Sequence, residues 1–377
     1  MENVTDYNFV LNYDELYPTE VIEEEGCEAV SLPQSSVVFS LVYCLIFVVG
    51  VLGNVLLVSA IVWKCWVKRV VDIFILNLAM ADIIFLITLP LWVDAEAWGK
   101  AWRGGLLLCQ LSSYVVAVNA YSSVLFLSCM SLDRYLAIMY PLHSRRFRSK
   151  AYAALACLLV WIVSLLLGLP VLRSRTIQVR GEKVSCCVED QNSTSPGVSL
   201  AYLLLTFYCP MLVTLVCYCS ISKKLCLQYR RSKKQDIKLR KSMRVVFLVV
   251  LAFLISWLPF KVFRSLELIL RWGAAPGSWS FQTMVGMGLV VSAPLAFANS
   301  CSNPIIYCLY DSSIQKAVLQ LLLPCLKPLH LSQLSITSDS QPSRSFSSNI
   351  TQEGASFRRR LDHPVVQLST WASNLQP

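Results

Sequence analysis

The sequence predicts an all-α membrane protein: a seven-transmembrane helix bundle with an amphipathic eighth helix. Of its 377 residues, 55% are hydrophobic and only 15% are charged, which is too apolar a mixture for soluble domains. The apolar residues gather in seven stretches of about 20 residues or more, the length at which a helix crosses a hydrocarbon core of ~30 Å. Helices are the expected form because lipid cannot satisfy the polar groups of the backbone.

The chain divides into four parts. An extracellular acidic arm covers 1–36, the bundle covers 37–309, the eighth helix covers 310–325, and a disordered cytoplasmic tail covers 326–377. In the eighth helix, apolar side chains recur at helical spacing, which predicts a helix lying on the membrane surface. The seven spans are expected at 37–63, 72–93, 106–139, 152–172, 199–221, 244–270 and 282–309.

Lysine and arginine mark the cytoplasmic side of the bundle. They gather in the loops after the first, third and fifth spans, the last of which holds ten basic residues between Lys223 and Arg244. Because basic loops stay in the cytoplasm, we expect the amino terminus outside the cell and the carboxyl terminus inside, with the protein in the plasma membrane. The net charge of +10 lies in short runs between apolar stretches, which disfavours a soluble enzyme and a nucleic-acid partner.

The acidic arm carries nine acidic side chains and no basic one. Tyr7, Tyr13 and Tyr17 stand among these acids, a pattern that suits tyrosine sulfation and the capture of a basic protein. A plain disordered tail is the alternative. Asn-Val-Thr at Asn3 and Asn-Ser-Thr at Asn192 are glycosylation acceptors, and both fall on the expected outer side.

Four of the 15 cysteines lie on the oxidising outer side: Cys27, Cys109, Cys186 and Cys187. An even number favours two disulfides. We expect Cys109, at the outer end of the third span, to join Cys186 or Cys187; Cys27 could pair with the other and so tie down the arm. Two adjacent cysteines leave the choice between them open. On the inner side, Cys325 is a palmitoylation candidate, with an ordinary thiol as the alternative.

Polar residues inside the spans form an ordered series of short motifs. In chain order they are Gly53-Asn54, Leu78-Ala79-Met80-Ala81-Asp82, Asp133-Arg134-Tyr135, Trp161, Pro210 with Tyr218, Trp257-Leu258-Pro259 and Asn303-Pro304-Ile305-Ile306-Tyr307. Each motif is weak alone. Together, each in its own span, they resemble the rhodopsin-like (class A) G-protein-coupled receptors over about 37–325. Ionisable groups within a span are costly and indicate function in any case.

The resemblance implies a switch that ends at the cytoplasmic side. In that family the arginine of the Asp-Arg-Tyr motif leaves its acidic neighbour on activation and meets the G protein; a charged pair that only anchors the helix is the alternative. The prolines of spans six and seven remove helix hydrogen bonds and so create kinks. The switch residues are expected to be Asp133, Arg134, Tyr135, Tyr218, Asn303, Pro304 and Tyr307, with Phe253, Trp257 and Pro259 as the activation hinge.

The resemblance also implies a cation site in the middle of the bundle. An oxygen-rich cluster with one carboxylate suits a hard monovalent cation. The family uses such a cluster for sodium, an allosteric modulator that would favour the resting state. A hydrated polar network without an ion is the alternative, and no other metal or cofactor is implied. The expected site residues are Asp82, Asn119, Ser123, Asn299 and Asn303.

The ligand class is narrowed by what the spans lack. Val116 stands where amine receptors of the family carry an aspartate, and Phe297 stands where opsins carry the retinal-binding lysine. The end of span two, 88–92, reads Thr-Leu-Pro-Leu-Trp and resembles the Thr-x-Pro kink of chemokine and related chemoattractant peptide receptors. Ala293 replaces a glutamate that chemokine receptors often carry, and 271–281 lacks their cysteine. The chain therefore resembles receptors related to the chemokine receptors more than it resembles the chemokine receptors themselves.

Four side chains near the outer face are candidates for ligand contact. Trp92 ends the second span. Lys261 and Arg264 lie three residues apart in the outer half of span six and could bind a ligand carboxylate. Glu267, one turn further, could instead neutralise Arg264.

These features predict a receptor without chemistry of its own. It would bind an extracellular peptide or small basic protein and act on a heterotrimeric G protein, which the resemblance assigns to the inhibitory class. Ten Ser and Thr residues between Ser332 and Thr351 suit receptor kinases and arrestin. The alternative within the family is a scavenger that internalises its ligand without G-protein signalling, against which the intact Asp-Arg-Tyr motif argues. A transporter would show repeated halves, which the seven unlike spans do not.

Overall fold

The computed structural model describes Cys27 and the ranges 35–65, 69–140, 149–180, 184–190, 193–229, 237–273 and 278–322. Six predicted modification sites lie outside the described residues: Asn3, Tyr7, Tyr13, Tyr17, Asn192 and Cys325. Most of the acidic arm and the whole of 326–377 lie outside them as well.

Seven helical segments of the described chain are long and apolar enough to cross a membrane, as the sequence predicts. They are α1 (Ser35–Ala60) with the π-helical turn η2 (Ile61–Cys65), α2 (Val70–Ala97), α3 (Gly105–Met139), α5 (Lys150–Ser174), α6 (Pro196–Leu203) with η3 (Leu204–Tyr208) and α7 (Cys209–Tyr229), α8 (Ile237–Arg271), and α9 (Trp279–Phe297) with α10 (Asn299–Tyr310). Each segment is longer than its expected span. Polar residues are tolerated at the membrane surface, so they can extend a helix beyond the hydrocarbon core.

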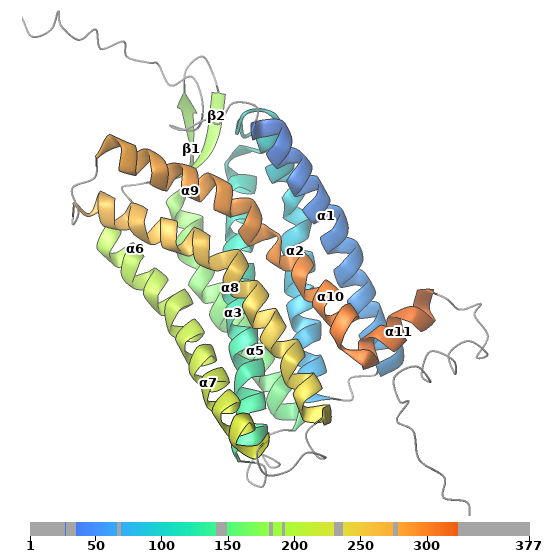
Figure 1. Cartoon of the computed structure of the whole chain (residues 1–377). Helices are drawn as coiled ribbons and strands as arrows, with labels where there is room; N and C mark the ends of the chain where they lie inside the picture. Colours follow the sequence, from blue (N-terminus) through green and yellow to red (C-terminus); the bar gives the residue numbers. More distant parts are fainter. Residues whose placement is uncertain are drawn as a thin grey trace, which may run out of the picture. The chain divides into compact units, whose positions relative to one another are not determined.

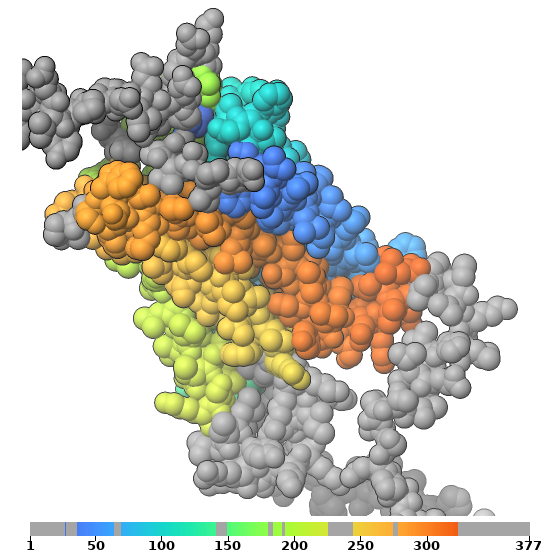
Figure 2. All heavy atoms as spheres, turned by 45° about the horizontal axis from the view of Figure 1, so that its top comes forward, coloured from blue at the N-terminus to red at the C-terminus, as the bar shows by residue number. Residues whose placement is uncertain are grey.

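The third span forms the centre of the bundle (Figure 1). α3 packs against α2, α5, α7 and α8, whereas α1 packs against α2 and α10, and α8 packs against α9. Figure 2 shows α1, the pair α9 and α10, and α8 following one another across one face. Leucine, isoleucine and valine are exposed on the outward sides of several helices, including Ile87, Leu166 and Leu205. An apolar outer surface of this kind fits a protein surrounded by lipid.

The first and seventh spans meet at the Gly53-Asn54 motif. Pro304 lies inside α10, and the interruption of the seventh span falls at Ala298 instead. Because proline has no N–H, the carbonyl of Ser300, four residues earlier, loses its helical partner. The Nδ2 group of Asn54 replaces that partner and donates to the Ser300 carbonyl at 2.8 Å. Gly53 permits the approach, since a Cβ there would lie 2.8 Å from the Pro304 ring.

The connection between α5 and α6 contains a β-hairpin that the sequence analysis did not predict. β1 (Arg175–Arg180) pairs antiparallel with β2 (Val184–Glu189), and β1 packs against α3. The Trp102 amide, in the connection after α2, donates to the Ser185 carbonyl at 2.7 Å. An isolated pair of strands is marginal in water, so these tertiary contacts account for the hairpin. We call this end of the bundle the hairpin end (Figure 1).

The predicted eighth helix is confirmed as α11 (Ser312–Leu322), and it marks the opposite, α11 end of the bundle. Asp311 caps it: the Oδ1 atom accepts the N–H groups of Ser313 at 2.9 Å and Ile314 at 3.3 Å. These are donors that have no carbonyl partner within the helix. Ile314 is buried while Leu322 is exposed, as expected for a helix with one side packed on the bundle.

Candidate functional site

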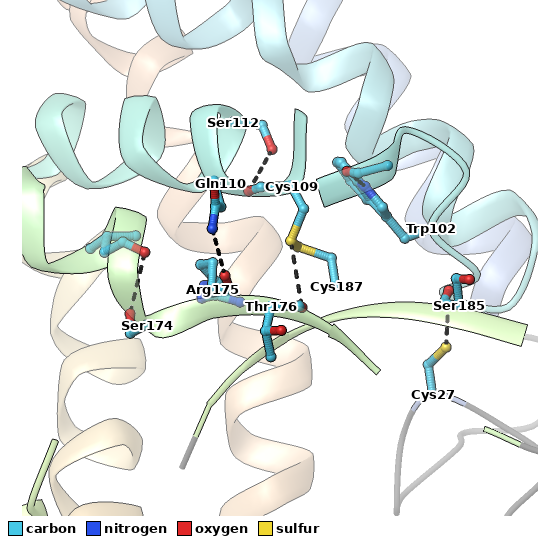
Figure 3. Close-up of a disulfide and its surroundings, with 12 residues drawn as sticks. Cys27, Trp102, Cys109, Gln110, Ser112, Ser174, Arg175, Thr176, Ser185 and Cys187 are labelled. Carbon is cyan, nitrogen blue, oxygen red and sulfur yellow. Dashed lines mark hydrogen bonds between the residues drawn. A yellow bond between two sulfur atoms is a disulfide. The ribbon is translucent and has the colours of Figure 1, made fainter. Parts of the chain in front are cut away.

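Two disulfides join the hairpin to the rest of the chain. Cys109, near the start of α3, pairs with Cys187 at a Cα–Cα distance of 5.7 Å (Figure 3). Cys27 of the arm pairs with Cys186 at 5.6 Å. Strand geometry separates the two alternatives of the sequence analysis, because successive side chains of a strand point to opposite faces. Cys187 faces the bundle, where Cys109 packs with Trp102. The hairpin is thus tied to α3 on one face and to the arm on the other.

Aromatic side chains cover the hairpin end of α2. The Trp92 ring lies 5.6 Å from the Trp102 ring and 6.4 Å from the Phe297 ring. The Nε1 group of Trp92 is buried and has no hydrogen-bond partner within the described part of the chain. A buried donor without an acceptor is rare in folded proteins, so the Trp92 indole retains one unused hydrogen-bond donor.

The two cations proposed for ligand contact have different surroundings. Nη1 of Arg264 lies 2.5 Å from the Glu267 carboxylate, and Nη2 lies 2.5 Å from the carboxylate of Glu189 on β2. Lys261 has no acidic partner among the residues that the structure describes. Its Nζ lies 5.2 Å from the Trp257 ring centre. Glu189 was not identified from the sequence, because it lies 75 positions from Arg264 in a hairpin that was not predicted.

The Lys261 amine rests on the aromatic cluster of the predicted hinge. It lies 5.6 Å from the ring of Phe207 and 6.0 Å from that of Phe260. The rings of Phe253 and Trp257 are 6.2 Å apart, and Pro259 lies within the continuous helix α8. The Nε1 group of Trp257 is buried without a hydrogen-bond partner in the described ranges. No hydrogen bond therefore opposes a rotation of this indole.

Of the five residues predicted to hold sodium, Asp82 forms hydrogen bonds with two of the others. Its Oδ1 atom accepts the Nδ2 group of Asn119 at 3.0 Å, and its Oδ2 atom accepts the Nδ2 group of Asn303 at 2.8 Å. The hydroxyl of Ser300 also donates to Oδ1, at 2.8 Å. Ser300 is an addition to the predicted set. Its position three residues before Asn303, on the same helix face, is the signal that could have found it.

The other two predicted sodium residues do not bond to this carboxylate. Ser123 and Asn299 each have a buried oxygen without a hydrogen-bond partner among the described residues. Buried oxygens of this kind are usually satisfied by water or by an ion. One carboxylate together with the unpaired hydroxyl oxygen of Ser123 and the unpaired amide oxygen of Asn299 is a set of ligands that suits a hard cation.

The Asp-Arg-Tyr motif lies at the α11 end of α3. Nε of Arg134 is 3.9 Å from Oδ2 of Asp133, and both side chains are buried. The Tyr135 ring contacts the Tyr140 ring at 6.2 Å. Just beyond the motif, Lys224 of α7 donates to the Ile138 carbonyl at 2.6 Å. This lysine holds α7 to the end of α3, where helix carbonyls favour a cation.

Two of the three switch tyrosines, Tyr218 and Tyr307, have no strong hydrogen-bond acceptor. The Tyr218 hydroxyl is buried and lacks a hydrogen-bond partner in the described part of the protein. The Tyr307 hydroxyl meets only the Met130 sulfur, at 3.8 Å, and thioether sulfur is a weak acceptor. Neither tyrosine is therefore fixed in place by a strong hydrogen bond.

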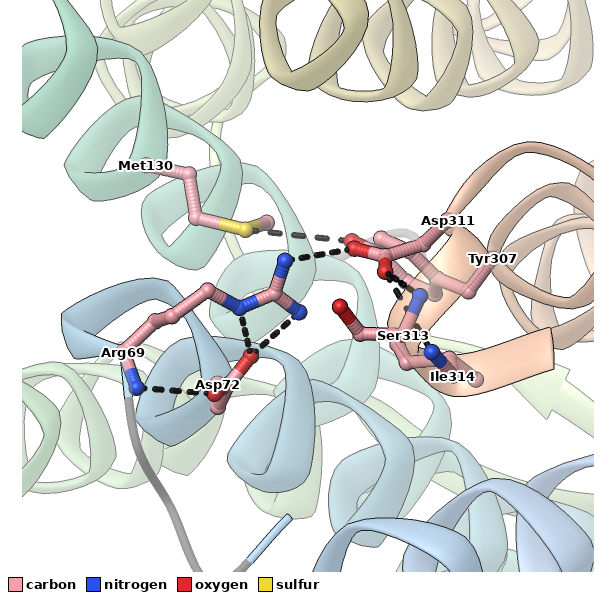
Figure 4. A network of polar contacts seen from close by, with 7 residues as sticks. All are labelled: Arg69, Asp72, Met130, Tyr307, Asp311, Ser313 and Ile314. Atoms are coloured by element: carbon pink, nitrogen blue, oxygen red, sulfur yellow. Dashed lines mark hydrogen bonds and ion pairs between the residues drawn. The ribbon is translucent and has the colours of Figure 1, made fainter. Parts of the chain in front are cut away.

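An ionic network joins the start of α2 to the start of α11 (Figure 4). Nε of Arg69 donates to Asp72 at 2.8 Å, and Nη1 donates to Asp311 at 2.9 Å. Burial disfavours the Arg69 charge, but the two aspartates outweigh it and raise the pKa of Arg69 above its ordinary value. The sequence indicates only that Arg69 lies in the basic loop after the first span. Its partner Asp311 lies 242 positions away.

Comparison with known proteins points to the same family as the sequence motifs. The family described as "7 transmembrane receptor (rhodopsin family)" matches residues 53–307. "G-protein coupled receptor 15" of Mus musculus is 41% identical over 87% of this chain and 91% of its own length. "Apelin receptor A" of Danio rerio is 35% identical over 92% of this chain and 98% of its own length. "Probable G-protein coupled receptor 25" of Mus musculus is 39% identical over 77% and 80%.

Three stretches of the sequence point to the same relatives. From the sequence, the segments 71–75, 89–94 and 294–301 predict a resemblance to receptor 15, with receptor 25 as the second choice. The similarity of the full chains to both receptors confirms this interpretation.

Proposed function

Since the chain belongs to the rhodopsin family of seven-transmembrane receptors, we propose that it binds an extracellular peptide or small basic protein and activates an inhibitory heterotrimeric G protein. The hairpin end would face outward at the plasma membrane and the α11 end would face the cytoplasm. One relative is named for apelin, which supports a peptide ligand. Receptor kinases and arrestin would act on the tail.

The surroundings of Lys261 are the main support for a ligand that carries a carboxylate. A cation without an acidic partner among the described residues, held above three aromatic rings, is a ready site for a carboxylate such as the C-terminus of a peptide. Cation–π contacts are worth about 0.5–2 kcal/mol, less than a charge-assisted pair offers. Arg264 is already held by two acids, so a ligand carboxylate there would have to displace one of them.

The same contact connects the ligand to the hinge. A carboxylate that draws the Lys261 amine from the Trp257 ring removes one of the contacts that hold this indole. Trp257 then turns, and α8 swings about Pro259 at the α11 end. There the Tyr218 and Tyr307 hydroxyls leave no strong hydrogen bond behind when they move. Arg134 separates from Asp133 and meets the G protein.

Neutralising Lys261 provides the test of the ligand site. Secreted basic peptides are first screened for inhibition of cyclic AMP formation. Against the active peptide, Lys261→Gln is expected to lower the affinity of the free C-terminal acid by about 10- to 100-fold, the range of one charge-assisted hydrogen bond. The C-terminal amide should be affected little. Binding is measured by competition for both forms.

Arg264→Gln is the matched control, because it also removes a cation from α8. It should change the affinities of acid and amide equally. An equal loss for both forms in Lys261→Gln would exclude the carboxylate contact. Arrestin recruitment without any G-protein response to any peptide would favour the scavenger instead.

We also propose that sodium binds at Asp82 and stabilises the resting receptor. Asp82 supplies the charge, and the unpaired oxygens of Ser123 and Asn299 support the assignment. In the wild type, replacing choline chloride by sodium chloride should lower basal nucleotide exchange. Asp82→Asn is expected to abolish that dependence, because the amide keeps the hydrogen-bonding shape but has no negative charge. Ser128→Ala, a hydroxyl of α3 that bonds to α7 instead, should keep it; a sodium response unchanged in Asp82→Asn would contradict the site.

A further inference from the structure

Glu189, the last residue of β2, has no part in the mechanism above. It shares Arg264 with Glu267, so one guanidinium of α8 is held by an acid of its own helix and by an acid of the hairpin. The side chains of Arg264, Glu189 and Glu267 are 22%, 32% and 29% exposed. Their charges are therefore only partly screened by water. The pair between Arg264 and Glu189 links two elements that are far apart in the sequence.

The hairpin is attached to α3 and to the connection between α2 and α3. Besides the disulfide to α3, Gln110 of α3 donates from Nε2 to the Arg175 carbonyl at 3.1 Å (Figure 3). The Trp102 amide, in the connection after α2, donates to the Ser185 carbonyl. These contacts make the hairpin one unit with α3. Through Arg264, Glu189 connects this unit to α8, the helix that carries the hinge.

A second arginine, Arg175, also interacts electrostatically with Glu189. Arg175 stands directly opposite Glu189 in the hairpin register. Burial lowers the pKa of Arg175; Glu189 opposes this shift, the positive charge of Arg264 adds to it, and Glu267 opposes it. The negative charge of Glu189 thus acts on two arginines that repel each other. Without its charge, the hairpin and α8 would present two cations to one another.

We propose that Glu189 is a positioning residue that restrains the hairpin end of α8 in the resting receptor. Its ion pair with Arg264 ties α8 to the hairpin, and the hairpin is held to α3. Trp257 and Pro259 lie nearer the middle of the same helix, so a restraint at Arg264 acts on one arm of the hinge. Loss of the pair shifts the equilibrium towards the active arrangement. The inference rests on the proposed function, because it takes G-protein activation as the output.

The first measurement is nucleotide exchange in membranes without ligand, normalised to the amount of receptor at the surface. Glu189→Gln keeps the shape of the side chain and removes its charge. It should raise basal exchange about two- to fivefold, the effect expected when one partly exposed pair is lost from one of two states. Asp94→Asn is the matched control: it removes an acid from an ion pair at the same end of the bundle, with Arg103, but leaves the link between the hairpin and α8. It should remain near the wild type, and an equal rise in both variants would overturn the proposal.

A double-mutant cycle separates the ion pair from other effects of the substitution. In an Arg264→Gln background, Glu189→Gln should have little further effect, since the pair is already absent. An undiminished rise in that background would show that Glu189 acts through another group and would overturn the role given to Arg264.

Amide hydrogen exchange in lipid nanodiscs tests the restraint without any G protein. Glu189→Gln should speed exchange in 184–190 and in 264–271, whereas Asp94→Asn should leave both segments unchanged. Unaltered protection in Glu189→Gln would refute the restraint itself. Faster exchange in a receptor that activates no G protein would keep the restraint and reject the proposed function, so the two failures can be told apart.

Discussion

Arg134→Ala is expected to reduce nucleotide exchange on the G protein to the level of membranes without receptor. Arg134 is 9% exposed and lies at the α11 end of the central helix, with Nε 3.9 Å from the Asp133 carboxylate. A guanidinium presents several donors in a fixed plane, which no smaller side chain reproduces. Alanine can neither pair with Asp133 nor reach a protein bound at this end. The readout is exchange in reconstituted membranes, with and without the active peptide.

Two controls distinguish this loss from misfolding. Surface expression and thermal stability of Arg134→Ala should stay close to those of the wild type. Arg173→Ala removes an exposed arginine near the hairpin end of α5 and should signal normally. Full exchange by Arg134→Ala would contradict the assigned role. Peptide binding should persist, because the ligand residues lie at the opposite end of the bundle.

The two disulfides are expected to differ in what their removal does. Joint replacement of Cys109 and Cys187 by serine should destabilise the receptor by roughly 2–5 kcal/mol and deplete it from the cell surface. This bridge closes 78 positions and holds the hairpin to α3. Joint replacement of Cys27 and Cys186 should leave the bundle folded, because it frees only the arm.

Ligand binding separates the second pair from a neutral change. If the tethered arm helps to capture the ligand, its release should weaken peptide binding about 10- to 100-fold through lost effective concentration. Thermal unfolding and surface labelling check the fold, and competition binding checks the affinity. Comparable loss of surface receptor in both double variants would reject this division of roles.

Much of the fold followed from local rules. A span needs about 20 apolar residues to cross the lipid, so all seven segments were found, although the helices extend beyond the expected ends by as much as eight residues, at Tyr229. The eighth helix followed from the apolar spacing that places Ile314 on its buried side. The hairpin was missed because its strands are stabilised by α3 and by two disulfides rather than by a pattern of their own.

The candidate site was predicted in part. Asp82, Asn119 and Asn303 do converge, whereas Ser300 entered the cluster without being predicted. Arg264 was chosen as a ligand contact, and the possibility that Glu267 neutralises it was foreseen. Its second acid, Glu189, was not. These omissions share one cause: each depends on which side chains meet after the helices have packed.

The sequence by itself determined the class of the protein, its spans, its motifs and the cysteines available for disulfides. Each of these depends on residues close together in the chain and on the lipid around it. Only the tertiary structure decided which cation is paired with an acid. Arg264 pairs with Glu189, which lies 75 positions away in the sequence, whereas Lys261 lies over aromatic rings. The tertiary structure also decided that the side chain of Asn54 donates a hydrogen bond to the Ser300 carbonyl, 246 positions away. The physical reason is that an ion pair or hydrogen bond depends on distance in space, which helix packing sets and local pattern does not.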